Sequence, residues 1–136
     1  MKKNEEFDRR TTLRGALLVA LTSIPALLSK ESAAAASTNI IKTSKLKVGA
    51  THTFTTSKQG IPAILFRNKT GVFAYSTICT HQGCSVTYNK GKKKLICPCH
   101  GAQFDPLAGA KPTAGPAETP LATIKVAIKG AWVVEL

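Results

Sequence analysis

Two short segments of the chain hold all four cysteines and two of the three histidines. The first is CTHQGC at residues 79–84, and the second is CPCHG at residues 97–101. Their metal-binding side chains are Cys79, His81 and Cys84 in the first segment and Cys97, Cys99 and His100 in the second. Thiolates and imidazoles are the donors used by zinc, copper and iron–sulfur centres. This clustering predicts a metal centre to which both segments contribute.

The spacing divides the six side chains into an outer set and a remaining pair. The outer pattern is C-x-H, fifteen intervening residues and then C-x-x-H. Each segment thus offers one thiolate and one imidazole, Cys79 with His81 and Cys97 with His100. The remaining pair, Cys84 with Cys99, is suited to a disulfide bond if the protein is exported.

Other chemistries fit part of this pattern. A zinc ion held tetrahedrally by the outer set leaves Cys84 and Cys99 without a role. Two disulfides without metal leave both histidines idle. A Cys–His nucleophile would need an orienting acid, for which Asp105 is the only candidate. Covalent haem is excluded because it needs C-x-x-C-H, and CPCH is one residue short.

Strand-like patterns surround both segments. Apolar or alternating runs occupy residues 62–68, 70–78, 84–89, 92–98 and 121–136. Residues 89–91 and 129–130 contain the glycines typical of hairpin turns. In the last run, Ile124, Val126 and Ile128 alternate and are expected on one face.

These patterns predict that residues 37–136 form one all-β domain, a small antiparallel sandwich or barrel. No helical period of useful length follows Ala36. Residues 108–120, rich in proline and glycine, are expected to form an ordered surface loop. Residues 37–59 carry no clear signature, and His52 among them is expected to be an ordinary strand or surface residue.

The first 36 residues have the order of an export signal. A charged segment ends at Arg9-Arg10, an apolar stretch covers residues 15–28, and small residues follow at 33–36. The uncharged stretch is shorter than the ~20 residues of a membrane-spanning helix, so cleavage near Ala36 is predicted, with an uncleaved anchor as the alternative. The segment DRRTTLR, residues 8–14, resembles a twin-arginine signal, which exports folded proteins.

The two cysteine–histidine segments resemble the cluster-binding boxes of Rieske iron–sulfur proteins. The resemblance implies a Rieske-type β-sandwich or barrel with a cluster-binding loop subdomain. It implies one 2Fe–2S cluster per chain, with one iron on Cys79 and Cys97 and the other on His81 and His100. The cluster would make the chain an electron-transfer subunit of an oxidoreductase rather than a stand-alone enzyme.

The second cysteine pair, Cys84 and Cys99, restricts the resemblance to one branch of the Rieske family. It is similar to the disulfide-bearing branch found in cytochrome bc-type complexes, their plastid relatives and arsenite oxidase small subunits. In that branch Cys84 and Cys99 would form a disulfide. GPAETPL, residues 115–121, looks like the proline-rich loop that covers the cluster.

Two residues depart from the respiratory pattern. That pattern usually has a serine where this chain has Ala102 and a tyrosine where it has Phe104. Their hydroxyls donate hydrogen bonds to cluster sulfurs and so favour the reduced state. Without them, the reduction potential is expected in the lower part of the Rieske range of about −150 to +300 mV.

The formal charge of +12 is carried mostly by scattered lysines, with one cluster at residues 90–94 that is expected to be a solvated hairpin tip. Nucleic acid is excluded as a partner because no aromatic or arginine-rich pattern accompanies the charge.

The expected partners are an acidic cytochrome b or c, or a molybdenum subunit, with quinol as a possible electron donor. A free periplasmic carrier, or a zinc- or disulfide-stapled exported binding module, are the alternatives. The expected location is the outer face of the cytoplasmic membrane or the periplasm, with membrane association through the leader or a partner.

Overall fold

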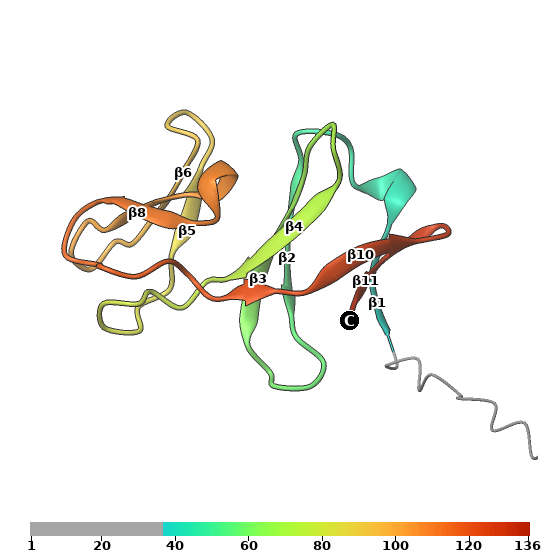
Figure 1. Cartoon of the computed structure of the whole chain (residues 1–136), viewed down its shortest axis with the longest axis horizontal. Helices are drawn as coiled ribbons and strands as arrows, with labels where there is room; N and C mark the ends of the chain where they lie inside the picture. Colours follow the sequence, from blue (N-terminus) through green and yellow to red (C-terminus); the bar gives the residue numbers. More distant parts are fainter. Residues whose placement is uncertain (1–36) are drawn as a thin grey trace, which may run out of the picture. The chain divides into compact units, whose positions relative to one another are not determined.

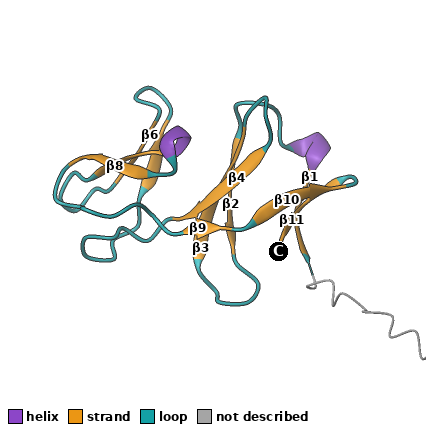
Figure 2. Cartoon of the chain, in the orientation of Figure 1, coloured by secondary structure: helices purple, strands orange, loops and turns teal. Residues whose placement is uncertain are grey.

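The computed structural model describes residues 37–136, and the predicted export signal, residues 1–36, lies outside the described residues. The described chain is built almost entirely of β-strands (Figures 1 and 2). The strands are β1 Thr38–Lys42, β2 Thr51–Thr55, β3 Pro62–Arg67, β4 Val72–Ser76, β5 Thr87–Asn89, β6 Lys94–Ile96, β7 Gln103–Asp105, β8 Lys111–Ala114, β9 Thr123–Ile124, β10 Val126–Lys129 and β11 Trp132–Glu135. Two 3-10 helices, η1 Thr43–Lys45 and η2 Pro106–Ala108, complete the elements. The all-β prediction is confirmed.

Two sheets form a base. One has the strand order β1-β11-β10 and the other the order β2-β3-β4-β9, and every pairing is antiparallel. Between them lies a core of Leu46, Leu65, Ala74 and Val133. Neither helix in the described part of the chain has the length and apolarity needed to cross a membrane.

Strand β3 is buried on both faces, which accounts for its unbroken apolar run. Side chains alternate along a strand, so Leu65 faces the base core while Ile64 and Phe66 enter a second core. Tyr75 of β4 joins this second core, and its hydroxyl donates a 3.0 Å hydrogen bond to the carbonyl of Pro106. The base is thereby tied to the segment that follows β4.

That segment is a subdomain inserted between two neighbouring strands. The chain leaves the base after β4 and returns in β9, which pairs with β4. Between them, β5, β6, β7 and β8 form a third antiparallel sheet in that order. Leu95 and Phe104 pair across β6 and β7 and are fully buried in the second core. The predicted hairpin at residues 89–91 is confirmed as the β5–β6 turn, although Lys93, and not Gly91, takes the left-handed conformation there, with φ of 54°.

One sequence expectation needs correction, and two others gain detail. Residues 108–120 are not all loop, because Lys111–Ala114 form β8 at the edge of the third sheet, where proline is tolerated. Residues 37–59 contain two strands, β1 and β2, and His52 lies on β2 opposite Leu65. Ile124 and Val126 pack against the base core, whereas Ile128 is 44% exposed.

Candidate metal centre

The two cysteine–histidine segments are loops with the same backbone hydrogen bonds. The N–H of Cys79 donates to the carbonyl of Cys84 at 2.8 Å, and the N–H of Gly83 donates back to the carbonyl of Cys79 at 2.9 Å. In the second loop, Cys97 donates to Ala102 at 2.8 Å and Gly101 donates back to Cys97 at 3.0 Å. Each loop therefore closes between its first and sixth residues.

A glycine makes each closure possible. Gly83 and Gly101 occupy the same fifth position of their loops, with φ of 74° and 72°. This left-handed conformation costs other residues about 1–2 kcal/mol. The two loops leave the same end of the third sheet, one before β5 and one between β6 and β7.

Cys79 and Cys97, the first residues of the two loops, are free thiols and are 3% and 2% exposed. Both side chains belong to the same buried core. Burial raises the pKa of the Cys79 thiol, whereas the backbone N–H groups of His81 and Gln82, which point at its sulfur, oppose that shift. A buried pair of sulfurs with N–H donors around it is the environment that an iron–sulfur cluster needs.

The rings of the two histidines, one from each loop, lie next to each other. The rings of His81 and His100 lie edge to face with centroids 4.9 Å apart. Nδ1 of His81 is buried and, within the described residues, has no hydrogen-bond partner. A buried polar atom without a partner costs free energy, and iron is a partner that would satisfy it. His100 is exposed.

The remaining cysteines are bonded to each other. Cys84 and Cys99 form a disulfide with Cα atoms 6.5 Å apart. The Cys97 sulfur lies within 4.8 Å of both bonded sulfurs. These three sulfurs form no metal site of their own, because the two in the disulfide offer no thiolate. The disulfide joins the two loops next to the Cys97 thiol.

A third segment, residues 115–120, contacts both loops. The hydroxyl of Thr80 donates a 2.8 Å hydrogen bond to the carbonyl of Thr119. At Gly115, whose φ is 83°, an added Cβ would lie only 2.5 Å from Cα of Ala102. Ala117 is buried in the same core as both thiols. These two contacts were not predicted, because nothing in the sequence pairs Thr80 with Thr119 or Gly115 with Ala102.

One other candidate from the sequence, Asp105, lies away from this centre. Asp105 forms a 2.8 Å salt bridge with Lys94 and caps η2 through the N–H of Leu107, at the opposite end of the third sheet. It is therefore not placed to orient a Cys–His nucleophile. Ala102 and Phe104 are fully buried, and the Ala102 carbonyl is the acceptor that closes the second loop.

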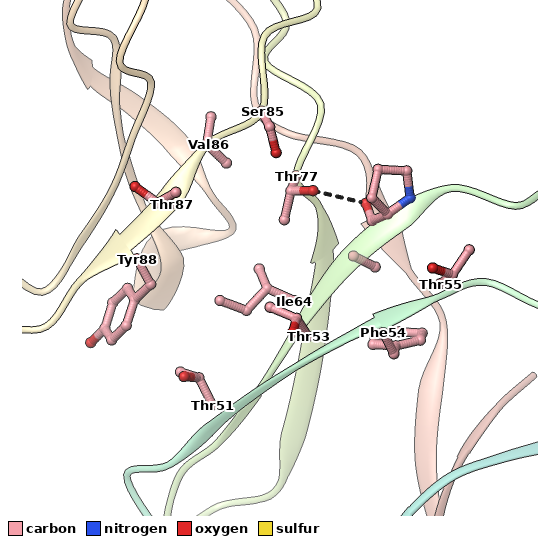
Figure 3. Close-up of a pocket in the computed structure, with 12 residues that line it drawn as sticks. Thr51, Thr53, Phe54, Thr55, Ile64, Thr77, Ser85, Val86, Thr87 and Tyr88 are labelled. Carbon is pink, nitrogen blue, oxygen red and sulfur yellow. Dashed lines mark hydrogen bonds between the residues drawn. The ribbon is translucent and has the colours of Figure 1, made fainter.

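A separate groove of about 560 Å³ runs between the base and the subdomain (Figure 3). Threonines from β2 line one side, and residues 85–88 line the other. Thr77 donates a hydrogen bond to the carbonyl of Pro62 at its edge. None of the six cysteine and histidine side chains lines this groove, so it is distinct from the metal centre.

Residues 37–125 match the model of the Rieske [2Fe-2S] domain. The chain belongs to this family. Its cofactor is accordingly a 2Fe–2S cluster, and the two free thiols and two adjacent imidazoles have the donor chemistry of a Rieske centre. The same donors would also suit zinc, but the family match excludes the zinc alternative.

Related proteins agree with this assignment. Over 59 residues the Rieske chain is 46% identical to the cytochrome b6-f complex iron-sulfur subunit of Prochlorococcus marinus strain MIT 9211, a match that covers 43% of the chain and 32% of that subunit. The chain thus spans well under half the length of the curated relatives it matches.

Two solved structures are also similar. A cyanobacterial plasma membrane Rieske protein from Synechocystis PCC 6803 is 31% identical, with a TM-score of 0.60, over 72% of this chain and 97% of that one. A chain of a hyperthermophilic respiratory Complex III is 27% identical, with a TM-score of 0.57, over 80% and 82% of the two chains.

Proposed function

We propose that this chain is an exported Rieske electron-transfer protein and the iron–sulfur subunit of a cytochrome bc-type, quinol-oxidising complex. The observation that carries the proposal is the pair of matching loops, which bring two buried free thiols and two adjacent imidazoles together beside a disulfide. The relatives in cytochrome b6-f and respiratory complexes support the choice of complex.

In this proposal Cys79 and Cys97 hold one iron, and His81 and His100 hold the other. The unpartnered Nδ1 of His81 is the atom best suited to an iron ligand. Once bound, such a cluster supplies one-electron redox chemistry. The thiols are shielded from water by the second core, while His100 is exposed at the surface where an electron partner would arrive.

The imidazoles have a second task. A histidine that binds metal through one ring nitrogen keeps the other to hold or release a proton near neutral pH. The exposed edge of His100 can therefore accept a proton from a quinol hydroxyl within hydrogen-bonding reach. Proton and electron uptake would thus occur at the same end of the subdomain.

The proposed partners are a cytochrome b that supplies the quinol site and a cytochrome c-type acceptor. The proposed location is the outer face of the cytoplasmic membrane, reached through the twin-arginine-like leader. This location is the same whether the leader is retained as an anchor or removed near Ala36.

Electron paramagnetic resonance of the full-length protein, purified and reduced with dithionite, tests the cluster. We expect a rhombic Rieske signal that is absent in Cys79→Ser. A colourless, silent protein that contains zinc would refute the proposal.

Affinity purification from native membranes tests the complex. Recovery of a haem-containing cytochrome b with the chain is expected, whereas recovery of a molybdenum subunit would replace the bc-type assignment. Reduction of the bound cluster by a quinol, followed by reoxidation by a c-type cytochrome, would complete the case.

A further inference from the structure

Within residues 37–136, the three sheets have six outer strands, and five of them are protected against pairing with a further strand. Strands β1 and β10 contain Lys42 and Lys129, and the register of β1 is also irregular. Strand β8 contains Lys111 and Pro112. Strands β5 and β9 are only three and two residues long. Lysine, proline, irregular register and short length all hinder the pairing of an outer strand with another chain.

Strand β2 is the exception. Its sequence, THTFT, is five residues long and contains neither a charged residue nor a proline. Its register with β3 is regular over all five residues. No strand of the described chain pairs with its other side, because β2 is the outer strand in the order β2-β3-β4-β9. This edge is therefore open to another strand.

The backbone groups of β2 that point away from β3 belong to its three threonines. At one end of β2 the carbonyl of Ala50 accepts a 3.1 Å hydrogen bond from the N–H of Arg67, and at the other end Thr56 donates a 2.9 Å bond to the carbonyl of Ile61. In an antiparallel pair, every second residue bonds to the neighbouring strand. The intervening residues at positions 51, 53 and 55 therefore direct their N–H and C=O groups outward.

This edge is complementary to itself. If two copies of β2 lie antiparallel around a twofold axis at Thr53, then Thr53 faces Thr53 of the second copy, and Thr51 faces Thr55. Each of these pairs joins two residues with outward N–H and C=O groups, so all of those groups find partners. Between them, His52 faces Phe54 of the second copy at a position where cross-strand side chains lie closest, and such aromatic pairs stabilise sheets.

The edge is also accessible and uncharged. Thr53 and Thr55 are exposed, and the groove of about 560 Å³ lies along the strand, with the threonine side chains on one wall (Figure 3). No residue that lines this groove carries a charge. The described chain has 13 lysines and arginines against 3 acidic residues. An acidic partner would be drawn to the lysines, none of which lies on β2, whereas a second copy meets a neutral strand that matches its own.

We propose that two copies of the chain associate through their β2 strands, which pair antiparallel and join the two four-stranded sheets into one. None of the six cysteine and histidine side chains lies on β2 or lines the groove, so the pairing uses none of the proposed cluster ligands. The inference goes beyond the proposed function and does not depend on the identity of the redox partners.

Sedimentation of the purified full-length protein over a range of concentrations tests the association. Pairing of two five-residue strands makes a small interface compared with the ~1,200–2,000 Å² of stable complexes, so we expect monomer at ~5 μM and mostly dimer at ~1 mM. Hydrogen exchange locates the contact. Exchange at residues 51–55 should be at least ~5-fold slower at the higher concentration, because the outward N–H groups then have partners.

Charge at the twofold axis makes the test specific. Thr53→Lys and Thr53→Glu each place two like charges opposite each other, so each should raise the dimer Kd at least ~10-fold. An equimolar mixture of the two variants should restore the dimer, because opposite charges then face each other across the axis. The matched control, Thr87→Lys, adds a charge to an exposed position on the other wall of the groove and should leave the Kd within ~2-fold of wild type.

The Rieske signal, unchanged in all three variants, shows that the fold is intact. Four outcomes would overturn the proposal: a wild type that stays monomeric at ~1 mM, equal weakening by Thr87→Lys, no dimer in the mixed sample, and protection of residues 51–55 that does not depend on concentration. The last result would mean that the edge is covered within a single chain. Loss of the Rieske signal in the wild type would count against the proposed function and not against the association.

Discussion

The two ends of the third sheet are held together in different ways. At one end, which we call the cluster end, the two cysteine–histidine loops have matching hydrogen bonds, are joined by the Cys84–Cys99 disulfide and contact residues 115–120. The opposite end, which we call the basic end, carries the lysines of the β5–β6 turn, residues 90–94. There, one carboxylate, that of Asp105, links β6 to η2. The sheet is thus rigid where a cofactor must be held and lightly held where the surface carries charge.

This difference in support matters for the cofactor. Ligand geometry needs redundant support, because an iron site tolerates little movement of its donors. The partly exposed Lys94–Asp105 ion pair at the basic end contributes little to stability and holds no cofactor. Changes at the cluster end should therefore have large effects on the cofactor, and changes at the basic end should have small ones.

The largest effect is expected from the cysteines. Cys79→Ser removes a proposed ligand and should leave almost no iron. Cys84→Ser and Cys99→Ser remove only the link between the loops, so they should weaken cluster retention about 10–100-fold while the Rieske signal persists in fresh protein. Iron and acid-labile sulfide per chain, followed over time, measure both. Equal and complete loss in all three variants would mean that the division into ligands and disulfide is wrong.

The next largest effect is expected from substitutions of three glycines. Gly83→Ala and Gly101→Ala have open space at Cβ and should each cost about 1–2 kcal/mol of unfolding free energy through backbone strain alone. Gly115→Ala adds a clash with the Ala102 backbone and should cost about 1–3 kcal/mol more. Urea unfolding compares them. If Gly115→Ala lowered the free energy of unfolding no more than the other two, the contact of Gly115 with Ala102 would be unimportant for stability.

The reduction potential is a finer measure of the cluster end. Ala102→Ser with Phe104→Tyr should raise it by about 40 mV for each new hydrogen bond, the equivalent of ~1 kcal/mol for one electron. Redox titration monitored by electron paramagnetic resonance gives the value. An unchanged or lower potential would mean that these side chains do not face the cluster.

The smallest effect is expected at the basic end. The hydrogen bond from Lys94 holds the pKa of Asp105 below its usual value. This stabilisation is present above the ordinary aspartate pKa of about 3.9 and is lost as the pH falls through the lowered folded value. Asp105→Asn should therefore be less stable than wild type at neutral pH, by under about 1 kcal/mol, and the gap should close in acid. A gap that widens in acid would contradict the assignment.

One hairpin of the subdomain and one hairpin of the base could be predicted from the sequence because their signals are local. Two glycine-containing turns and alternating apolar residues suffice for the β5–β6 and β10–β11 hairpins. The Rieske family and its cofactor were implied by the resemblance of the two cysteine–histidine segments to Rieske cluster-binding boxes, and both are confirmed by the family match. The assignment of the individual ligands remains a prediction.

The missed elements depend on distant partners. β1 pairs only with β11, some ninety residues away, and its register is interrupted between Asn39 and Ile41. β8 is an edge strand containing Pro112, which is typical of a loop when only neighbours in sequence are considered. The approach of Gly115 to Ala102 likewise follows from tertiary packing, and no sequence pattern announces it.

The insertion of the subdomain between β4 and β9 also sets the order in which the chain can fold. The subdomain sheet is made from one continuous segment, so its contacts can form as soon as residues 77–122 are available. The base sheet β1-β11-β10 joins the first described strand to the last one. It cannot close until synthesis has reached Trp132–Glu135. During translation, the two cysteine–histidine loops are therefore complete before the base sheet β1-β11-β10 can close.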